Sequence, residues 1–297
     1  MPYRNLILWY GGKFRALNEI LPLVNNTKHK IFVEVFGGGG SIILNKNPSE
    51  LDIYNDIHEG LISFFRVLRD RESMEKFKKL ILLTPWSRTE WKTFRTKWRK
   101  EKNIIKKAFM FYYTTNLTFQ GQIDVGNGGF RFCKTNRSHI KSYFKKMNYL
   151  FYFHKKILQL QIESLDWKRL IKTYDSEDTL FYLDPPYIHS TRKLPNAYNH
   201  EFTNANHREM LLYLVKKVKG KILLSGYNNI MYNKILVDKY GWGKKEFKAY
   251  IAINYKSEID IKKAKEKRKR TEVLWISPNC NINIKRKSIN ELLKKES

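Results

Sequence analysis

The sequence is poor in cysteine and has no long apolar run, and both absences narrow the class of protein. Cys133 and Cys280 are the only cysteines, too few for a disulfide framework or a zinc site built from cysteines alone. No stretch approaches the roughly 18 apolar residues that a membrane span requires. The first ten residues show no signal-peptide cleavage pattern. We therefore expect a cytoplasmic protein with no membrane partner.

Acidic residues are scarce relative to basic ones. The chain has 57 Lys and Arg against 28 Asp and Glu, a formal net charge of +29. Such a charge repels itself, and a polyanion such as nucleic acid relieves the repulsion. A host whose proteins are all lysine-rich would give the same composition, so charge alone leaves both explanations open. The basic residues run from Lys13 to Lys295 rather than forming one tail, which favours a folded basic surface.

Histidines with metal-ligand spacing are also missing. His139 and His154 are too far apart in sequence, and no pair of carboxylates accompanies them. We therefore expect no metal site.

Apolar, β-branched segments predict the fold class. Runs at 30–36, 51–54, 179–183, 221–225 and 272–277 are typical of buried strands. Helical spacing separates several of them, and strands that alternate with helices imply an α/β fold. The prediction is a doubly wound, mostly parallel, Rossmann-like sheet.

The middle of the chain predicts a helical insert. Ser87-Arg-Thr-Glu90 is a capping box ahead of a helix, and glycines later break the pattern and favour a hairpin near 119–137. We expect residues 1–59 and 161–297 to form one catalytic core. Residues 60–160 are expected to form a helical subdomain.

The segment Asp184-Pro185-Pro186-Tyr187 follows a predicted strand and suits chemistry on an amine. The N6 amine of adenine is a poor nucleophile because its lone pair is delocalised into the ring. A carboxylate and a backbone carbonyl that accept its two N–H groups would stabilise the charge that the nitrogen gains. Asp184 and the Pro185 carbonyl are the candidates, and Tyr187 offers a surface on which a flipped-out base can stack. The alternative is a structural Pro-Pro turn capped by an aspartate.

A glycine-rich segment follows another predicted strand. Gly37 to Gly40 would let the backbone turn tightly and approach a ligand, and Ser41–Leu44 could then open a helix. Asp56 ends the next predicted strand, where an acidic side chain can hold ribose hydroxyls. As an alternative, Asp56 caps a helix, because Glu59 follows three residues later.

Four ordered motifs together resemble the Dam-type family of DNA adenine methylases, the D12 class. The motifs are Trp9-Tyr-Gly-Gly-Lys13, the segment 32–41, Asn55-Asp56-Ile57 and Asp184–Tyr187. Shorter similarities continue to the end of the last predicted strand, including Ser190-Thr-Arg192, Tyr198, Phe202, His207-Arg-Glu209, Lys221–Tyr227 and Glu272–Ile276.

The resemblance implies a class I methyltransferase that depends on S-adenosylmethionine and releases S-adenosylhomocysteine. Its reaction would be methylation of N6 on a flipped-out adenine in duplex DNA. It implies cofactor contacts from Trp9, Lys13, Phe36, Gly38, Gly40, Asp56, Asp166 and Asp184. Asp166 has an alternative role as the cap of a helix that begins near Trp167. No metal is needed, since a sulfonium methyl group is already electrophilic.

The chain departs from the family at two places. Val35 stands where the family usually has proline, and the helical insert matches poorly. Within the insert, Asn116 and Phe119 resemble the opening of the family's DNA-recognition hairpin. The residues that follow and are candidates for contacts to bases or phosphates are Phe130, Arg131, Lys134 and Arg137.

Double-stranded DNA is therefore the expected partner and the nucleoid the expected location. In a restriction-modification system, a separately encoded restriction endonuclease would be a second partner. One alternative is an amino methyltransferase acting on cytosine N4 or on RNA. Another is a non-catalytic DNA-binding protein on a methylase fold. The hypothesis fails if the Asp184 carboxylate is buried in a salt bridge far from any cleft.

Overall fold

Seven strands form one sheet in the computed structural model, which describes residues 6–123, 128–133, 138–188, 202–250 and 269–282. The strands are β1 (Ile31–Glu34), β2 (Leu51–Asn55), β3 (Leu160–Glu163), β4 (Thr179–Leu183), β5 (Lys221–Tyr227), β6 (Gly243–Tyr250) and β7 (Lys269–Ile276). Their order across the sheet is β3-β2-β1-β4-β5-β7-β6. The first five strands of that order are parallel, and β7 runs antiparallel to both β5 and β6. The predicted doubly wound, mostly parallel sheet is confirmed.

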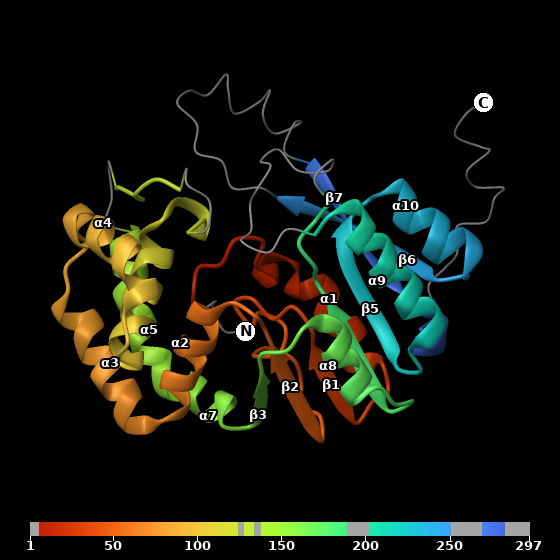
Figure 1. Ribbon diagram of the computed structural model, residues 1–297, viewed down its shortest axis with the longest axis horizontal. Helices are drawn as coiled ribbons and strands as arrows, with labels where there is room; N and C mark the ends of the chain where they lie inside the picture. Colours follow the sequence, from red (N-terminus) through yellow and green to blue (C-terminus); the bar gives the residue numbers. More distant parts are fainter. Residues whose placement is uncertain (1–5, 124–127, 134–137, 189–201, 251–268, 283–297) are drawn as a thin grey trace.

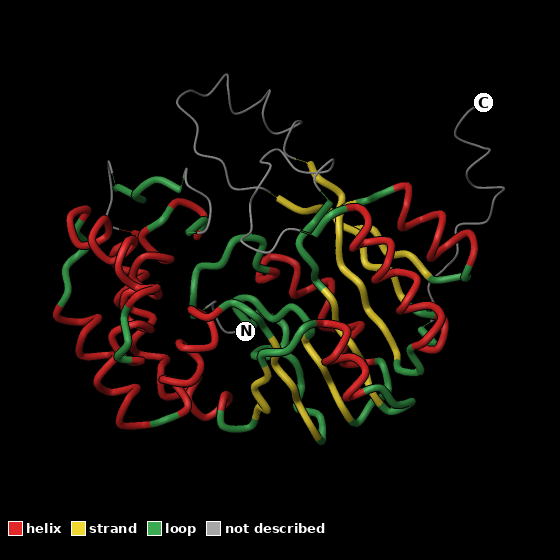
Figure 2. Tube along the Cα trace, viewed as in Figure 1, coloured by secondary structure: helices red, strands yellow, loops and turns green. Residues whose placement is uncertain are grey.

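The strand at the centre of the sheet, β4, consists mainly of hydrophobic residues and is covered on both faces. All five residues of β4 are buried, as expected for a parallel strand with both faces covered. The two faces pack separate apolar clusters, because successive side chains of a strand point to opposite sides. Figure 2 shows helices on both sides of the strands.

One face of the sheet carries α8 (Trp167–Tyr174), α9 (Asn204–Lys217), α10 (Ile230–Tyr232) and the π-helix η6 (Asn233–Lys239). The other face carries the 3-10 helix η1 (Lys13–Ala16) and α1 (Leu17–Asn26). A short 3-10 helix, η7 (Pro278–Cys280), follows β7. None of the helices within the described residues is long and apolar enough to cross a membrane.

The chain between β2 and β3 forms a block of helices at one side of the sheet (Figure 1). Its elements are α2 (Glu59–Arg69), α3 (Arg71–Leu83), α4 (Arg88–Lys97), η2 (Trp98–Lys100), α5 (Ile104–Leu117), η3 (Phe119–Gly121), α6 (Ser138–Lys145), η4 (Lys146–Tyr149) and α7 (Leu150–Ile157). Aromatic rings fill its interior; Phe64 of α2 stacks on Tyr112 of α5 with ring centroids 5.3 Å apart. The Ser87 side chain accepts a hydrogen bond from the Glu90 backbone N–H at 3.2 Å, so the predicted cap of α4 is confirmed.

One local expectation was wrong. Ser41–Leu44 was expected to open a helix, but it forms consecutive turns. The left-handed backbone at Gly38 and Gly40 (φ +51° and +67°) bends the chain back on itself there instead of extending a helix. His207 lies inside α9, which begins at Asn204 behind a capping box formed by Thr203 and Asn206.

Candidate active site

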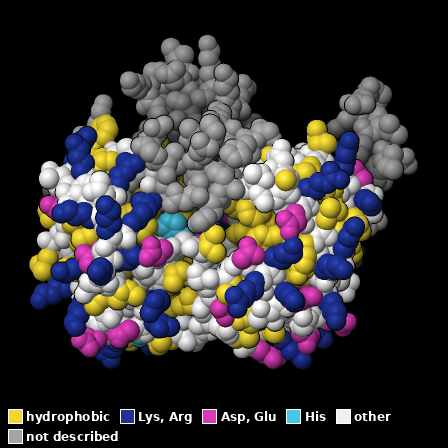
Figure 3. Space-filling view, viewed as in Figure 1, with side chains coloured by type: hydrophobic (Ala, Val, Ile, Leu, Met, Phe, Trp, Pro, Cys, Tyr) yellow, Lys and Arg dark blue, Asp and Glu magenta, His cyan; other side chains and the backbone are white. Residues whose placement is uncertain are grey.

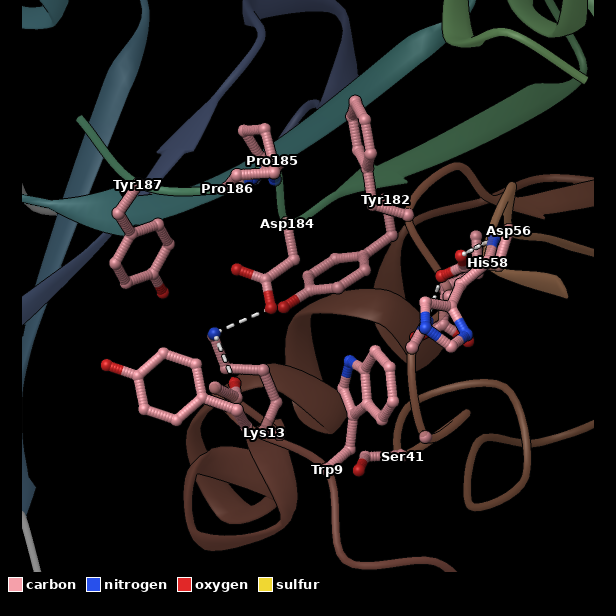
Figure 4. Close-up of a pocket in the computed structure, with 18 of the residues that line it drawn as sticks. Trp9, Lys13, Ser41, Asp56, His58, Tyr182, Asp184, Pro185, Pro186 and Tyr187 are labelled. Carbon is pink, nitrogen blue, oxygen red and sulfur yellow. Dashed lines mark hydrogen bonds and ion pairs between the residues drawn. The ribbon is translucent and has the colours of Figure 1, made fainter. Parts of the chain in front are cut away.

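The strand order reverses between β1 and β4, and the loops that leave the carboxyl ends of the strands meet there. In open α/β sheets this switch point is where ligands bind. A cleft of about 930 Å³, measured out to its open mouth, lies between these loops and the segment 9–13. Its lining residues are Trp9–Lys13, Glu34, Phe36–Gly39, Ser41, Asp56–His58, Tyr182, Asp184–Tyr187 and Phe202. Figure 4 shows several of these side chains converging on one space.

The glycine-rich loop lies close to the wall formed by Trp9. A Cβ atom built on Gly38 would lie 2.7 Å from the Trp9 ring, and Gly38 has a left-handed backbone. The Gly38 carbonyl accepts a hydrogen bond from the Tyr54 hydroxyl at 2.7 Å. Gly40 turns away from the cleft and faces Leu44 and Phe65. Of the two predicted glycines, only Gly38 therefore lines the cleft.

Asp56 fixes the loop after β2 to the glycine-rich loop. One carboxylate oxygen accepts the Gly38 N–H and the other accepts the His58 N–H, each at 2.8 Å. The residue that caps α2 is His58, so the helix-cap alternative for Asp56 is wrong. Burial raises the pKa of Asp56, although these backbone N–H groups oppose the shift.

Asp184 forms a buried ion pair at the wall of the cleft. Its Oδ2 lies 2.6 Å from the Lys13 Nζ, and the two side chains are 17% and 6% exposed. Lys13 Nζ also donates to the Gly11 carbonyl at 3.1 Å. Asp184 is thus in a salt bridge, but it lines the cleft, so the condition that would have refuted the hypothesis is not met.

The pKa values of both groups in this pair are shifted from their ordinary values. Burial raises the pKa of Asp184, and Lys13 opposes that rise. Burial lowers the pKa of Lys13, but Asp184, Glu272 and Tyr182 raise it further, so the net shift is upward. Asp184 Oδ1 is buried and has no hydrogen-bond partner within the described part of the chain. The nearby Tyr187 hydroxyl also lowers the pKa of Asp184, although neither this hydroxyl nor Asp184 Oδ1 forms a hydrogen bond among the described residues.

Tyr187 stands next to the ion pair. Its ring packs edge-on against Tyr227 with centroids 4.5 Å apart, and Lys13 Nζ lies 4.9 Å from its ring centroid. Pro185 and Pro186 line the cleft between Asp184 and Tyr187. The loop therefore presents a carboxylate and an aromatic ring to the same space.

Glu34 is a site residue that sequence analysis missed. It ends β1, is 2% exposed, and accepts a hydrogen bond from the Ile43 N–H at 3.1 Å. Burial raises its pKa to about 8, and the nearby carboxylates Asp184 and Asp56 contribute. The available signal was a single acidic residue within an otherwise apolar strand. Tyr182 and His58 also line the cleft and carried no comparable signal.

Asp166 does not line the cleft. Its side chain is exposed and accepts the Lys168 N–H at 2.9 Å, which caps α8. The structure thus shows the cap that was the alternative for this residue. Phe36, by contrast, lines the cleft as expected and packs edge-on against Phe202 with centroids 5.8 Å apart.

The candidates for DNA contact have different environments. Phe119 is 41% exposed, whereas Asn116 is buried and accepts a hydrogen bond from Lys146 Nζ at 2.9 Å. Phe130 packs against Trp86 and Trp91 with centroids 6.4 and 5.7 Å away.

The Arg131 guanidinium lies 2.7 Å from the His139 ring nitrogen Nδ1. Lys134 and Arg137 lie outside the described residues. Of the candidates within the described residues, Phe119 has the most exposed side chain.

The turn between Phe119 and Gly121 connects this region to the cleft. The Phe119 N–H donates to the Gly129 carbonyl at 2.9 Å, and the Arg131 N–H donates to the Leu117 carbonyl at 2.7 Å. A Cβ atom on Gly121 would lie 2.5 Å from the Leu8 carbonyl oxygen, directly before Trp9. The expected hairpin region therefore packs against the segment that forms the wall of the cleft.

Comparison with known proteins identifies a matching family. The family model described as D12 class N6 adenine-specific DNA methyltransferase matches residues 9–259, and this range contains both the cleft and the helical block.

Three curated relatives are similar over about 60% of the chain. "DNA adenine methylase" of Haemophilus influenzae is 25% identical over 195 residues, which cover 63% of this chain and 65% of the relative. "Type II methyltransferase M.CviBI" of Paramecium bursaria Chlorella virus NC1A is 23% identical over 187 residues, covering 61% and 68%. "Modification methylase StsI" of Streptococcus sanguinis is 26% identical over 196 residues, covering 62% of this chain but 28% of the relative. The first match thus spans less than two thirds of that relative's own length.

Proposed function

Because the chain belongs to the D12 class of N6 adenine-specific DNA methyltransferases, we propose that it transfers a methyl group from S-adenosylmethionine to N6 of adenine in double-stranded DNA. The family membership confirms the resemblance predicted from the four motifs. One observation carries the proposal: the Asp184–Tyr187 loop and the glycine-rich loop line the same cleft.

The lining of the cleft fits S-adenosylmethionine. Its Asp, Glu and Lys side chains among the described residues are Lys13, Glu34, Asp56 and Asp184. Glu34 has a pKa of about 8 and is mostly neutral at pH 7, so two carboxylates, Asp56 and Asp184, face one ammonium. A sulfonium nucleoside with an amino-acid tail suits this excess of carboxylates, and Asp56 ends β2 where an acidic group can bind a ribose. Trp9, Phe36 and Gly38 would supply the apolar and close-packed walls. When bound, S-adenosylmethionine supplies an electrophilic methyl group.

The chain's own residues would act mainly by positioning and charge. Asp184 Oδ1, which has no partner among the described residues, is available to accept one N–H of the adenine amine. The Pro185 carbonyl would accept the second, and Tyr187 would stack against the base. As nitrogen bonds to the methyl carbon and the carbon–sulfur bond breaks, the amine loses a proton. Asp184 is placed to receive that proton.

The positive charge of the chain suits a duplex that covers the cleft. Figure 3 shows Lys and Arg side chains over the helical block on the visible face. The exposed basic residues of α4 and η2 in this block are Arg88, Lys92, Lys97, Arg99 and Lys100. Arg95 of α4 donates to the Gly128 carbonyl at 2.5 Å, next to the turn that packs on Leu8. We propose that residues 60–160 form a target-recognition subdomain beside the catalytic core of 1–59 and 161–297.

One experiment tests the function. The purified chain is incubated with unmethylated genomic DNA and S-adenosylmethionine labelled in its methyl group, and the DNA is digested to nucleosides. We expect label in N6-methyladenine. Label in N4-methylcytosine instead, or transfer only to RNA, would replace the proposed substrate. No transfer to any nucleic acid would favour a binding protein.

A further inference from the structure

Glu272 is a partly buried glutamate for which the proposed reaction has no role. It lies on β7, and its Oε2 is buried without a hydrogen-bond partner in the described part of the chain. Burying a carboxylate is unfavourable unless a charge or hydrogen bond compensates. We therefore expect the Glu272 carboxylate to interact with a nearby cation or to have a role in function.

The register of the sheet shows which face Glu272 occupies. It pairs with Tyr227 of β5, and paired residues of neighbouring strands share a face. Leu274, two residues along β7, packs in the apolar cluster that includes α1, whereas Val273 packs in the cluster on the opposite face. Glu272 therefore faces the side on which η1 carries Lys13.

Neighbouring contacts bring Glu272 close to the catalytic loop. The Tyr227 ring packs against Tyr187, whose ring centroid is 4.9 Å from Lys13 Nζ. Glu272 and Asp184 both raise the pKa of Lys13, and Lys13 opposes the rise that burial causes in the pKa of Glu272. One buried ammonium thus lies within electrostatic reach of two carboxylates. The Lys13 ammonium donates a hydrogen bond to Asp184 at 2.6 Å. Glu272 Oε2 has no hydrogen-bond partner among the described residues.

This arrangement bears on what Asp184 must do. A carboxylate held by an ammonium is a weaker acceptor for the adenine amine and a weaker base for its proton. Asp184 would act best if Lys13 loosened its hold during the reaction. A buried lysine that lost its sole counter-ion would be strongly destabilised. A second carboxylate on the same side avoids that penalty.

We infer that Glu272 is a positioning residue that holds the Lys13 ammonium while Asp184 engages the adenine amine. The inference rests on the proposed function. Glu272 acts through Lys13 and touches neither the base nor the methyl donor. The ammonium moves between two carboxylates that are already present, so the net charge of the site is unchanged by the exchange.

The test compares Glu272→Gln with wild type in single-turnover methylation of unmethylated genomic DNA at saturating S-adenosylmethionine. We expect the transfer rate to fall on the order of ten- to a hundredfold, the size of effect that misplacing a reacting group produces. The affinity for S-adenosylmethionine, measured by calorimetry, should stay close to that of wild type. Because Lys13 then remains with Asp184, which lowers the Asp184 pKa, the acidic limb of the rate–pH profile should move to lower pH.

The matched control is Glu246→Gln on the neighbouring strand β6. Glu246 carries the same charge, is half exposed and pairs with Lys244, and its register partner Val273 lies on the opposite face of the sheet. Its variant should keep the wild-type rate and pH profile. If Glu272→Gln keeps them too, or loses cofactor affinity in proportion to its rate, the inference is overturned.

Two further measurements keep the outcomes distinct. If wild type makes no N6-methyladenine, the proposed function fails; if wild type is active and Glu272→Gln equals it, only the role of Glu272 fails. Should circular dichroism show Glu272→Gln unfolded, Glu272→Asp replaces it. The inference then requires a reduced rate at unchanged cofactor affinity, and a wild-type rate would overturn it.

Discussion

At the scale of single residues, the ion pair between Lys13 and Asp184 dominates the site. Both groups are buried, and their hydrogen bond of 2.6 Å fixes the orientation of the carboxylate at the cleft wall. Lys13 comes from η1 and Asp184 from the end of β4, 171 residues apart in sequence. The pair therefore also joins the first segment of the chain to the centre of the sheet.

Asp184→Asn should abolish most of the methyl transfer while sparing DNA binding. The change keeps the shape of the side chain but removes the charge that we propose stabilises the reacting amine, so we expect a loss of at least about a hundredfold in the single-turnover rate. Filter binding of DNA and circular dichroism check that the fold persists. Asp178→Asn is the matched control, because Asp178 is half exposed in an ion pair with Lys30 just before β4. Near-normal turnover of Asp184→Asn would refute the assigned role.

Glu34 should make the unliganded protein less stable as the pH rises. Its pKa is raised by burial from 4.5 to about 8. Between these values the folded chain keeps a proton that the unfolded chain releases, so the free energy of unfolding falls with increasing pH. Glu34→Gln removes this dependence. The variant should exceed wild type in stability at pH 8 by about a few kcal/mol, and the difference should shrink towards pH 5.

Urea unfolding of both proteins between pH 5 and pH 9 measures that difference. Asp56 and Asp184 also have raised pKa values, but they remain in both proteins, so the difference between the two proteins comes mainly from Glu34. A difference that stays constant across this pH range would contradict a raised Glu34 pKa.

Sequence patterns predicted the proposed catalytic and cofactor-binding residues better than the residues packed around them. Asp184, Asp56 and Lys13 lie in short motifs that combine unusual residue types, and all three line the cleft. Glu34 stood in such a motif, but its burial depends on the turns at 37–44 and cannot be judged from spacing. Glu272 opens a strand in the sequence, and only the pairing of β7 with β5 brings it near Lys13.

At the scale of elements, buried strands were predictable and edge strands were not. β4 is one continuous apolar run, whereas β3 is partly exposed and carries Gln161. β6 begins with the charged sequence Lys244-Lys245-Glu246, which gives no apolar pattern. Edge strands need little apolar surface and often carry charge, so hydrophobic periodicity misses them. The length of β7, which lies between β5 and β6, was also underestimated, because this strand starts at Lys269 among basic residues that give no apolar pattern.

Adding one methyl group at Gly121, in the turn Phe119–Gly121, should destabilise the protein. Gly121 has φ +70°, and a Cβ atom there would lie 2.5 Å from the Leu8 carbonyl oxygen. Gly121→Ala therefore forces either this turn or the segment before Trp9 to move. We expect a loss of about 1–3 kcal/mol in the free energy of unfolding, measured by urea denaturation, and a reduced methylation rate.

Gly129→Ala is the control within the same region. A Cβ atom on Gly129 would meet nothing within 4 Å, and the Gly129 carbonyl still accepts the Phe119 N–H. This variant should unfold like wild type. Equal stability losses in both variants would mean that the contact with Leu8 is not the cause.

At the scale of the whole molecule, the sheet order explains why distant motifs form one site. β1 and β4 are neighbours although 144 residues, 35–178, lie between the end of β1 at Glu34 and the start of β4 at Thr179. The helical block fills most of that interval. Local sequence patterns do not reveal such a long connection, because hydrophobic periodicity predicts individual helices and strands but not which strands are neighbours in the sheet. The alternation of strands and helices restricts the choice to doubly wound sheets, in which the carboxyl ends of the strands share an edge. The four motifs could therefore be expected to converge before the order of the strands was known.

Because the net charge is +29, the affinity for DNA should fall steeply as the salt concentration rises. We expect the lysines near the cleft, rather than the total charge, to cause most of this dependence. Each lysine that neutralises a phosphate adds about 0.9 to the slope of log K against log salt. Lys92, Lys97 and Lys100 are exposed on α4 and η2, the helices that adjoin the Gly128 contact and hence the turn on Leu8. Replacing all three with glutamine should lower the slope by up to about three.

A control variant loses the same number of lysines at the opposite end of the strands from the cleft. It tests whether the position of the lysines, rather than their number, sets the salt dependence. Lys216, Lys217 and Lys219 are exposed at the carboxyl end of α9, next to the start of β5 and thus opposite the cleft. Their triple glutamine variant has the same net charge as the α4 variant, so any effect of overall charge is equal in the two. Fluorescence titration of a DNA duplex from 50 to 200 mM salt should show a wild-type slope for this control. Equal slopes for the two variants would mean that the basic residues act only through total charge, and that the duplex does not lie against α4.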